Sequence, residues 1–274
     1  MNILLFVIGN SSVLHLQAHY ALRTLHVHSQ KDDKLYILTD APVLYKKLPF
    51  VEVIEITEQE IKDWYKGYFF RIKINAIRKF AELHDNGHLL FVDCDTYCFN
   101  NLSPIKNLLD NDYGVMHKDE GSMETMKGDS GVMWNQTKGR MFADVTITNA
   151  FHMWNSGVVG IPRGQVANVM NKSLALCDAL LNEGVTCFNL EQWSVSIALQ
   201  EYTKGIKETH ELIGHYWHHK YVWTRYIAVF FADSYAHGGN LEKELHVIKK
   251  TNHKRLSARL ALQRALMKVF CKNH

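Results

Sequence analysis

Two aspartates, Asp93 and Asp95, follow the short apolar segment 88–92 and are the sharpest chemical signal in the sequence. Side chains two positions apart on a strand share a face, and at a strand end two carboxylates can bind one hard divalent cation through oxygen. Mg²⁺ or Mn²⁺ held in this way can bridge the phosphates of a nucleotide and neutralise a departing diphosphate. Asp-x-Asp is common by chance, so a pair of solvated carboxylates that ends a strand is the competing interpretation.

A second signal is the pair of cations Arg71 and Lys73 in the first turn of a predicted helix over 71–83. The helix dipole favours acidic residues at the N-terminal end of a helix, so two cations there are better explained if they face an anionic ligand. The alternative is a solvated basic helix end that continues into Arg78 and Lys79.

The hydrophobic pattern predicts the elements that position these groups. Strand-like apolar segments cover 3–8, 35–40, 51–56 and 88–92, and helical spacing covers 13–27 and 71–83. This alternation predicts a parallel sheet with helices on its faces. Ligand sites of such sheets lie beyond the carboxyl ends of the strands, which is where Asp93 and Asp95 fall.

The second half of the sequence is less regular. A polar stretch with scattered glycines over 117–150 shows no clear period and predicts a long functional loop. Beyond it, the pattern predicts helices over 165–181 and about 191–199 and a late strand over 211–217. No repeat or linker divides the chain, so we expect one catalytic domain over 1–240 and a tail over 241–274.

Composition excludes several classes of protein. The 274 residues are 47% hydrophobic with a net charge of +3, which suits a globular domain and gives no field that would attract nucleic acid. The five cysteines form no CxxC pair, and we interpret them as reduced thiols of a cytoplasmic protein. No apolar run approaches the length of about 18 residues that a membrane span needs, and the N-terminal run is too short for a signal segment.

The balanced net charge hides two opposed regions. Residues 1–248 carry 23 basic against 28 acidic side chains, whereas 249–274 carries eight Lys or Arg and no Asp or Glu. From residue 256 onward the apolar side chains cover a broad helical face, which predicts a basic amphipathic helix. Such a helix can lie on an anionic membrane surface, or it can pack on the domain with its cations in water.

Taken in order, the motifs resemble those of the metal-dependent GT-A glycosyltransferases, most closely the retaining galactosyltransferase and glycogenin type of family 8. The matching segments, over roughly residues 1–225, are 36–40, Arg71-Ile72-Lys73, Asp93-Cys94-Asp95, Asn155-Ser156-Gly157, Glu191-Gln192 and 215–223. The resemblance implies a single-domain α/β GT-A fold, Rossmann-like in its nucleotide-binding part. It also implies transfer of a hexose from a nucleotide-diphosphate sugar, UDP-linked, to a glycan or lipopolysaccharide-type acceptor in surface polysaccharide assembly.

For the metal site, the resemblance implies that Asp93 and Asp95 bind Mn²⁺ or Mg²⁺ with His215 as the third ligand. Lys220 would then lie on the diphosphate. In the family the lysine usually follows the histidine by six residues, whereas Lys220 follows His215 by five. His218 or His219 could therefore be the ligand, and a hydrogen-bonded aromatic surface strand is the structural alternative.

The resemblance also implies contacts to the donor nucleotide. Ile8, Gly9, Asn10 and Asp40 would contact the base or ribose, and Arg71, Lys73 and Cys94 would lie among the donor-binding residues. Gly9 permits close approach of the backbone to a ligand. Asp40 equally suits a turn, because the sequence Thr39-Asp40-Ala41-Pro42 has good turn chemistry.

For the transferred sugar, the resemblance implies contacts from Asn155, Ser156 and Gly157, and it places Glu191 and Gln192 beside the reacting carbon, with Asp95 also counted as catalytic. Ser194 stands where the family often has a second acid. The structural alternative for Glu191 is a favourable charge near a helix N-terminus.

Two other functions compete with this interpretation. One is a catalytically inactive sugar-binding or scaffold protein on the same fold. The other is a sugar nucleotidyltransferase, which usually opens with a glycine-rich loop containing Arg and Lys, and residues 8–20 contain neither. For the active transferase, we expect a cytoplasmic location, with the basic tail as the contact to the inner face of the membrane.

Overall fold

The first half of the chain folds as its hydrophobic pattern predicts, with helices between parallel strands. The computed structural model describes residues 1–84, 86–185 and 187–248. This half consists of β1 (Asn2–Val7), α1 (Ser12–His28), β2 (Lys34–Thr39), the 3-10 turn η1 (Pro42–Leu44), β3 (Val51–Glu55), α2 (Glu58–Tyr65), α3 (Arg71–Leu83) and β4 (Leu89–Val92). The Ser11 side chain caps α1, and Thr57 and Glu60 form a capping box on α2, so both helices begin where side chains satisfy free backbone groups.

The second half adds shorter strands and three long helices. Its first elements are β5 (Thr96–Cys98), α4 (Ser103–Asp110), β6 (Gly114–Met116), β7 (Asp119–Ser122), the 3-10 turn η2 (Met123–Thr125), α5 (Gly128–Thr137), β8 (Met141–Phe142) and β9 (Val145–Thr146). The later ones are β10 (His152–Trp154), β11 (Val158–Ile161), α6 (Val166–Asn182), α7 (Leu190–Tyr202), β12 (Ile206–Glu208), β13 (Ile213–His215), the turn η3 (Trp217–His219), α8 (Lys220–Ala236) and α9 (Leu241–His246).

Seven strands form one mixed sheet in the order β12-β6-β11-β4-β1-β2-β3. β1 pairs in parallel with β2 and β4, and β2 pairs in parallel with β3. β11 alone runs antiparallel to its neighbours, β4 and β6. As a result, the carboxyl ends of β1, β2 and β4 and the amino end of β11 lie at the same edge of the sheet.

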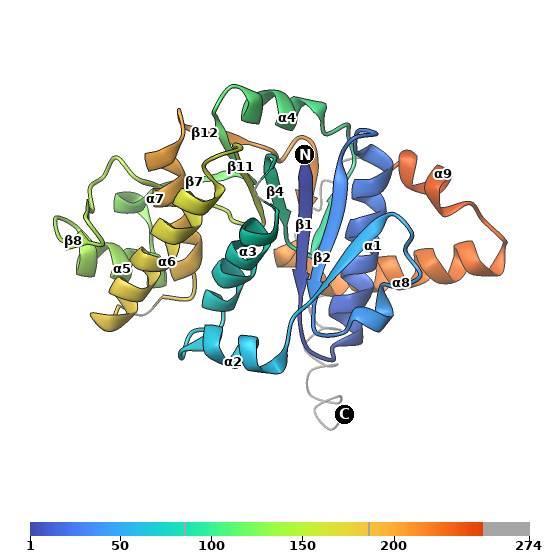
Figure 1. Cartoon of the computed structure of the whole chain (residues 1–274), viewed down its shortest axis with the longest axis horizontal. Coiled ribbons are helices and arrows are strands. Elements are labelled where there is room, and N and C mark those ends of the chain that lie inside the picture. The colour runs from blue at the N-terminus through green and yellow to red at the C-terminus, as the bar shows by residue number, and fades with distance from the viewer. Residues whose placement is uncertain (85, 186, 249–274) are drawn as a thin grey trace.

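Helices cover both faces of this sheet, with α3 and α1 on opposite sides of β1 (Figure 1). On one face, residues of α3, α6 and α7 share a core with Leu4 and Phe91, and on the other, residues of α1 and α4 share a core with Ile3 and Leu5. A third cluster, around Tyr20, joins α1 to α8 and α9. The described residues therefore form a single three-layer α/β domain.

The prediction of one long loop over 117–150 is wrong, because this region contains β7, η2, α5, β8 and β9. It has buried side chains of its own, namely Met123, Met133, Trp134, Phe142 and Ile147. Each element is too short to show a hydrophobic period over the 11 or more residues that such a pattern needs, as a rough guide. The region therefore looks irregular in sequence although it has a core.

The predicted amphipathic helix of the tail falls within 249–274 and lies outside the described residues. Before it, α9 packs against α1, and the Leu245 side chain is fully buried there. Among the described residues, no helix combines the length and the apolar character that crossing a membrane requires. The four described cysteines, Cys94, Cys98, Cys177 and Cys187, carry free thiols.

Candidate active site

The carboxyl edge of the sheet gathers the predicted chemical groups. β4 ends at Val92 and delivers Asp93 and Asp95, and the backbone N–H of Asp93 donates to the Gly157 carbonyl at 2.8 Å. This bond continues the β4–β11 ladder by one step and places the segment 155–157 beside the aspartates. The reversed direction of β11 therefore brings the start of one strand to the end of its neighbour.

Asp93, Asp95 and His215 form a cluster that suits a cation. One ligand atom from each lies within 4.8 Å of the others. The short antiparallel pair β5–β13 creates this arrangement, because it sets His215 opposite Thr96, the residue after Asp95. Of the three histidines considered from sequence, the geometry brings His215 to the aspartates, whereas His218 and His219 lie in η3.

The orientation of the His215 ring fits a role as a metal ligand. Its Nδ1 lies 2.8 Å from the Asn155 side-chain carbonyl, which can only accept, so Nδ1 carries a proton and Nε2 points to Asp95 at 3.3 Å. A cation bound between these groups would meet the Nε2 lone pair of the imidazole beside two carboxylates, a donor set that Mn²⁺ or Mg²⁺ accepts. The ring also fills space that only glycine leaves open, since a Cβ at position 157 would overlap it.

The charge state of Asp95 agrees with a ligand role. Burial would raise the pKa of its carboxyl, but the hydrogen bond and charge of His215 and the charge of Lys220 outweigh it, so the pKa lies below its ordinary value. Lys220 Nζ lies 2.8 Å from the second carboxylate oxygen. Asp95 is therefore ionised although its side chain is only 6% exposed.

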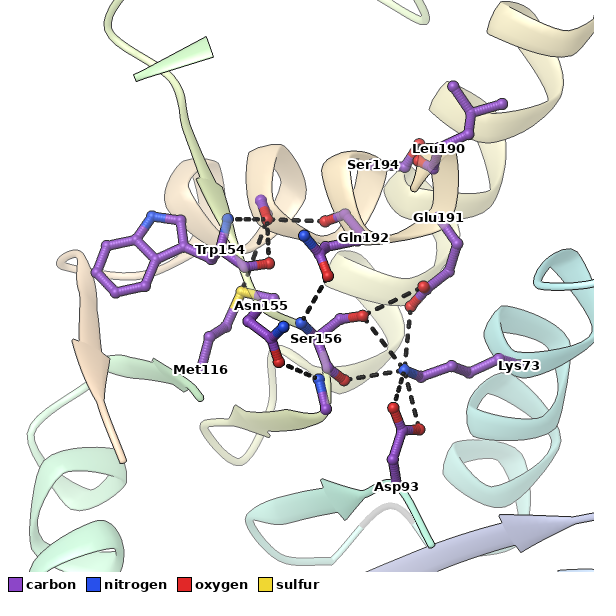
Figure 2. Close-up of polar contacts among 12 residues, drawn as sticks. Lys73, Asp93, Met116, Trp154, Asn155, Ser156, Leu190, Glu191, Gln192 and Ser194 are labelled. Atoms are coloured by element: carbon purple, nitrogen blue, oxygen red, sulfur yellow. Dashed lines mark hydrogen bonds and ion pairs between the residues drawn. The ribbon is translucent and has the colours of Figure 1, made fainter. Parts of the chain in front are cut away.

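Lys73 is the hub of a second, buried network (Figure 2). Its ammonium donates to the Asp93 carboxylate at 3.2 Å and to the Ser156 carbonyl at 2.9 Å, and it lies 3.5 Å from Glu191. Burial would lower the pKa of Lys73, but the charges of Asp93 and Glu191 raise it above its ordinary value. A charged lysine is thus held between two carboxylates.

Glu191 and Gln192 begin α7 and face the same network. The Ser156 hydroxyl donates to one Glu191 carboxylate oxygen at 3.2 Å, whereas the other oxygen is buried without a hydrogen bond. Burial raises the pKa of Glu191 against the lowering effect of Lys73. The Gln192 amide oxygen accepts from the Ser156 N–H at 3.3 Å, which fixes the plane of the amide.

Glu120 completes the arrangement, and the sequence did not reveal it. From β7, its two carboxylate oxygens accept from the Asn155 amide at 3.0 Å and from the Gln192 amide at 2.9 Å. It thereby joins Asn155, the partner of His215, to Gln192. Glu120 lies in the stretch predicted to be a loop, and only the pairing of β7 with β10 shows where it points.

These side chains line one cavity of about 380 Å³. Ten of the predicted residues line it: Lys73, Asp93, Asp95, Asn155, Ser156, Gly157, Glu191, Gln192, His215 and Lys220. Three aromatic residues that the sequence analysis did not single out, Phe70, Phe188 and Trp217, also line its wall.

The predicted nucleotide-contacting residues after β1 and β2 lie at the same sheet edge but not in this cavity's wall. The Gly9 N–H lies 3.1 and 3.0 Å from the two Asp40 oxygens, and His15 Nε2 lies 2.8 Å from the Gly9 carbonyl. Gly9 adopts a φ of 86°, a left-handed conformation that glycine tolerates without strain. These bonds hold the loop over Ile8, Gly9 and Asn10 beside the end of β4, with Asn10 exposed.

Three other residues considered from sequence also lie outside the cavity wall. Arg71 forms a bidentate pair with Asp178 at 2.6 and 2.9 Å, so its charge is neutralised within the protein. Burial raises the pKa of the Cys94 thiol to about 12, which keeps it protonated. The Ser194 hydroxyl donates to the Leu190 carbonyl within α7 (Figure 2).

Comparisons with known proteins show similarity in structure rather than in sequence. No protein-family model matches the sequence. No curated protein matches it either. Solved structures do match, among them the galactosyltransferase LgtC in complex with donor and acceptor sugar analogues, at a TM-score of 0.51 and 12% identity, over 76% of this chain and 73% of that one. An active-site mutant of LgtC, with a glutamine replaced by glutamate, gives a TM-score of 0.51 and 11% identity over 76% of this chain and 72% of that one. This chain therefore has the single-domain α/β fold of the GT-A type, as its motifs predict.

Proposed function

We propose that this protein is a metal-dependent glycosyltransferase that transfers a hexose from a nucleotide-diphosphate sugar, UDP-linked, to a hydroxyl group of a glycan acceptor. One observation carries the proposal: a single cavity unites a cluster that can hold a cation, two lysines and a buried carboxylate, one oxygen of which has no hydrogen bond. The fold adds support, because the similar protein LgtC was solved with donor and acceptor sugar analogues.

In this proposal Asp93, Asp95 and His215 hold Mn²⁺ or Mg²⁺. When bound, the ion supplies positive charge that neutralises the diphosphate of the donor as it leaves. Lys220 adds a second cation, because its half-exposed ammonium lies against Asp95 and can also donate to a phosphate oxygen. Both charges act where negative charge develops, which is the usual source of catalysis in group transfer.

Glu191 and Gln192 orient the hexose. The Glu191 oxygen that has no hydrogen bond lies 3.5 Å from the Lys73 ammonium and can still accept a hydrogen bond from a sugar hydroxyl. Gln192 is held rigidly by Ser156 and Glu120, so its amide can lie beside the anomeric carbon. Asn155 uses its amide to hold His215 and Glu120, so we assign it to positioning, with Ser156 and Gly157 as the closer neighbours of the sugar.

The chemical step then needs position and charge more than covalent help from the protein. The bond from the anomeric carbon to the diphosphate oxygen breaks, and the acceptor oxygen forms a bond to the same carbon. The electron pair leaves with the nucleoside diphosphate, and the proton of the acceptor hydroxyl passes to an oxygen of that diphosphate.

We assign the base and ribose to the segment from Ile8 to Asn10 and to Asp40. The parallel pairing of β1 with β2 and β4 sets these residues at the same edge as Asp93. A nucleotide whose phosphates lie at the aspartates can extend across the end of β1. The Asp40 carboxylate keeps acceptor capacity beyond its bonds to Gly9 for a ribose hydroxyl.

The basic segment 249–274 supports a further part of the proposal, peripheral attachment of a cytoplasmic enzyme to an anionic membrane face. Its charge of +8, from eight Lys or Arg without Asp or Glu, is opposite to that of such a surface. Attachment would bring the enzyme to lipid-linked acceptors, such as the lipopolysaccharide type. The division into a domain over 1–240 and a tail over 241–274 stays a prediction from sequence; because α9 packs on α1, the membrane contact is proposed for 249–274 alone.

The test is release of nucleoside diphosphate from a panel of UDP-, GDP- and ADP-sugars with Mn²⁺, Mg²⁺ or EDTA. We expect activity with one donor class that EDTA abolishes. Asp95→Asn should lose at least about 100-fold in rate, since it removes a charged ligand, whereas the exposed Asp63→Asn should retain full activity. If no donor is turned over with either ion, the protein is an inactive sugar-binding relative instead. Formation of a sugar nucleotide from a sugar phosphate would favour a nucleotidyltransferase.

A further inference from the structure

A second hollow adjoins the candidate active site. Residues 67–70, Asp129, Leu181, Cys187 and Phe188 line a groove of about 510 Å³, which we call the aromatic groove. Phe70 and Phe188 line both this groove and the cavity described above. The two hollows therefore share a wall made by Phe70 and Phe188.

The aromatic side chains of this groove are exposed to an unusual degree. Phe69 is 54% exposed and Phe188 is 68% exposed. Large apolar side chains gathered on a surface commonly mark a place where a ligand or partner binds. The rings of Phe70 and Phe188 meet edge to face, with centroids 4.9 Å apart, so they form one continuous apolar surface.

The aromatic groove is also rigidly built. The Tyr68 hydroxyl donates to the Phe188 carbonyl at 2.8 Å and accepts from the Glu191 N–H at 3.0 Å, which ties the two loops of the groove to the start of α7. Burial raises the pKa of Tyr68, so its hydroxyl stays protonated and keeps donating. Behind it, the bidentate pair of Arg71 with Asp178 anchors the first turn of α3.

The chemistry of the walls favours a sugar ring over an acyl chain. The C–H groups on one face of a pyranose carry partial positive charge and pack on the negative face of an aromatic ring. The exposed carboxylate of Asp129 also lines the groove and can accept hydrogen bonds from sugar hydroxyls. An acyl chain would instead desolvate that carboxylate without giving it a partner.

We propose that the aromatic groove is the acceptor site and binds pyranose rings of a glycan by stacking on Phe69 and Phe188. The inference rests on the proposed function, because it makes the glycan in the groove the substrate that accepts the hexose. A chain of sugars lying on this surface passes over Phe70 and Phe188 into the cavity. Its terminal hydroxyl then meets the hexose beside Glu191 and Gln192.

The test is binding of the full chain to an array of immobilised neutral and acidic oligosaccharides, without donor sugar. We expect the wild type to bind at least one class of glycan. Phe69→Ala should weaken that binding about tenfold, the order of one lost aromatic contact, and Phe69→Tyr should restore it. Tyr65→Ala is the matched control, because Tyr65 is a 47% exposed aromatic residue at the end of α2 outside the groove.

Three results would overturn the proposal: no glycan bound by the wild type, equal binding by Phe69→Ala and wild type, or binding of phosphatidylcholine vesicles that Phe69→Ala weakens. Thermal melting of each variant excludes a folding defect. The proposed function is tested separately by metal-dependent release of nucleoside diphosphate. Donor turnover without glycan binding would reject the aromatic groove alone, and glycan binding without donor turnover would reject the transferase.

Discussion

Replacing Lys73 with Met should destabilise the protein strongly, because this lysine neutralises two carboxylates in a buried place. Its ammonium lies 3.1 Å from Asp93 and 3.5 Å from Glu191, and the Lys73 and Glu191 side chains are only 8% and 5% exposed. Removing one partner of a buried ion pair typically costs about 3–5 kcal/mol, since the remaining charge is uncompensated. We expect a loss of this size, which is a large part of a typical total stability of about 5–15 kcal/mol.

The loss should depend on pH in a defined direction. Burial and Asp93 already raise the pKa of Glu191, and Lys73 opposes them. Without Lys73, the pKa of Glu191 in the folded protein should rise further. At a pH above the ordinary pKa of glutamate, Glu191 should then hold a proton in the folded protein that it has lost in the unfolded chain. Folded protein that binds more protons loses stability as pH rises, so the deficit of Lys73→Met should be larger at pH 8 than at pH 5.

The measurement is urea unfolding followed by tryptophan fluorescence, with EDTA present so that cation binding does not enter the comparison. Glu191→Gln in the Lys73→Met background should recover about 1 kcal/mol or more, because it removes the unpaired charge. Lys62→Met is the control: its partner Glu58 is 83% exposed, and surface pairs of this kind contribute about 0.5 kcal/mol or less. A deficit below about 1 kcal/mol for Lys73→Met, or one that Glu191→Gln does not reduce, would refute the reasoning.

Three further changes test other parts of the structure. Gly157→Ala should weaken Mn²⁺ binding by about 10–100-fold in calorimetry, because the added Cβ would displace the His215 ring. The control is Gly87→Ala, whose Cβ meets only a flexible side chain and which should bind Mn²⁺ as the wild type does. Equal affinity of the two variants for Mn²⁺ would contradict the metal site. Burial, with His215 nearby, lowers the pKa of His117 to about 3. Between that value and the ordinary pKa of histidine, His117 is neutral in the folded protein and protonated in the unfolded chain. The stability should therefore fall as pH decreases through this window, and His117→Gln, measured in EDTA, should flatten the dependence of stability on pH. An unchanged slope between pH 5 and 7.5 would refute the assignment. Deleting 249–274 should abolish co-sedimentation with phosphatidylglycerol vesicles and spare neutral ones, and unchanged co-sedimentation would refute the membrane role.

The sequence predicts the first half of the fold well because its elements are long and periodic. The prediction of a helix over 71–83 has the same bounds as α3, and the strand that delivers Asp93 is where the apolar run indicates. Buried parallel strands and amphipathic helices carry strong local patterns. The cations at the start of α3 are expected from sequence to face an anionic ligand. In the structure, Arg71 pairs with Asp178 and Lys73 pairs with Asp93 and Glu191 of the protein itself.

The rest of the site depends on contacts between distant segments, which local patterns do not encode. Glu120 reaches Asn155 and Gln192 only because β7 pairs with β10. Phe188 likewise joins Phe70 because α7 begins beside α3, more than a hundred residues away in sequence. Tertiary pairing of this kind sets the direction of a side chain, whereas the sequence specifies only its type.

The reversed strand β11 limits how the cavity can open. It joins β4 and β6 by continuous backbone hydrogen bonds, so the aspartates after β4 and the segment 155–157 before β11 belong to one rigid sheet. A hinge between two halves of the sheet would have to break this ladder. In the proposed enzyme, a donor would therefore enter and a product leave by motions of the outer segments that carry Phe70, Phe188 and Trp217, while the ends of β4 and β11 keep their places.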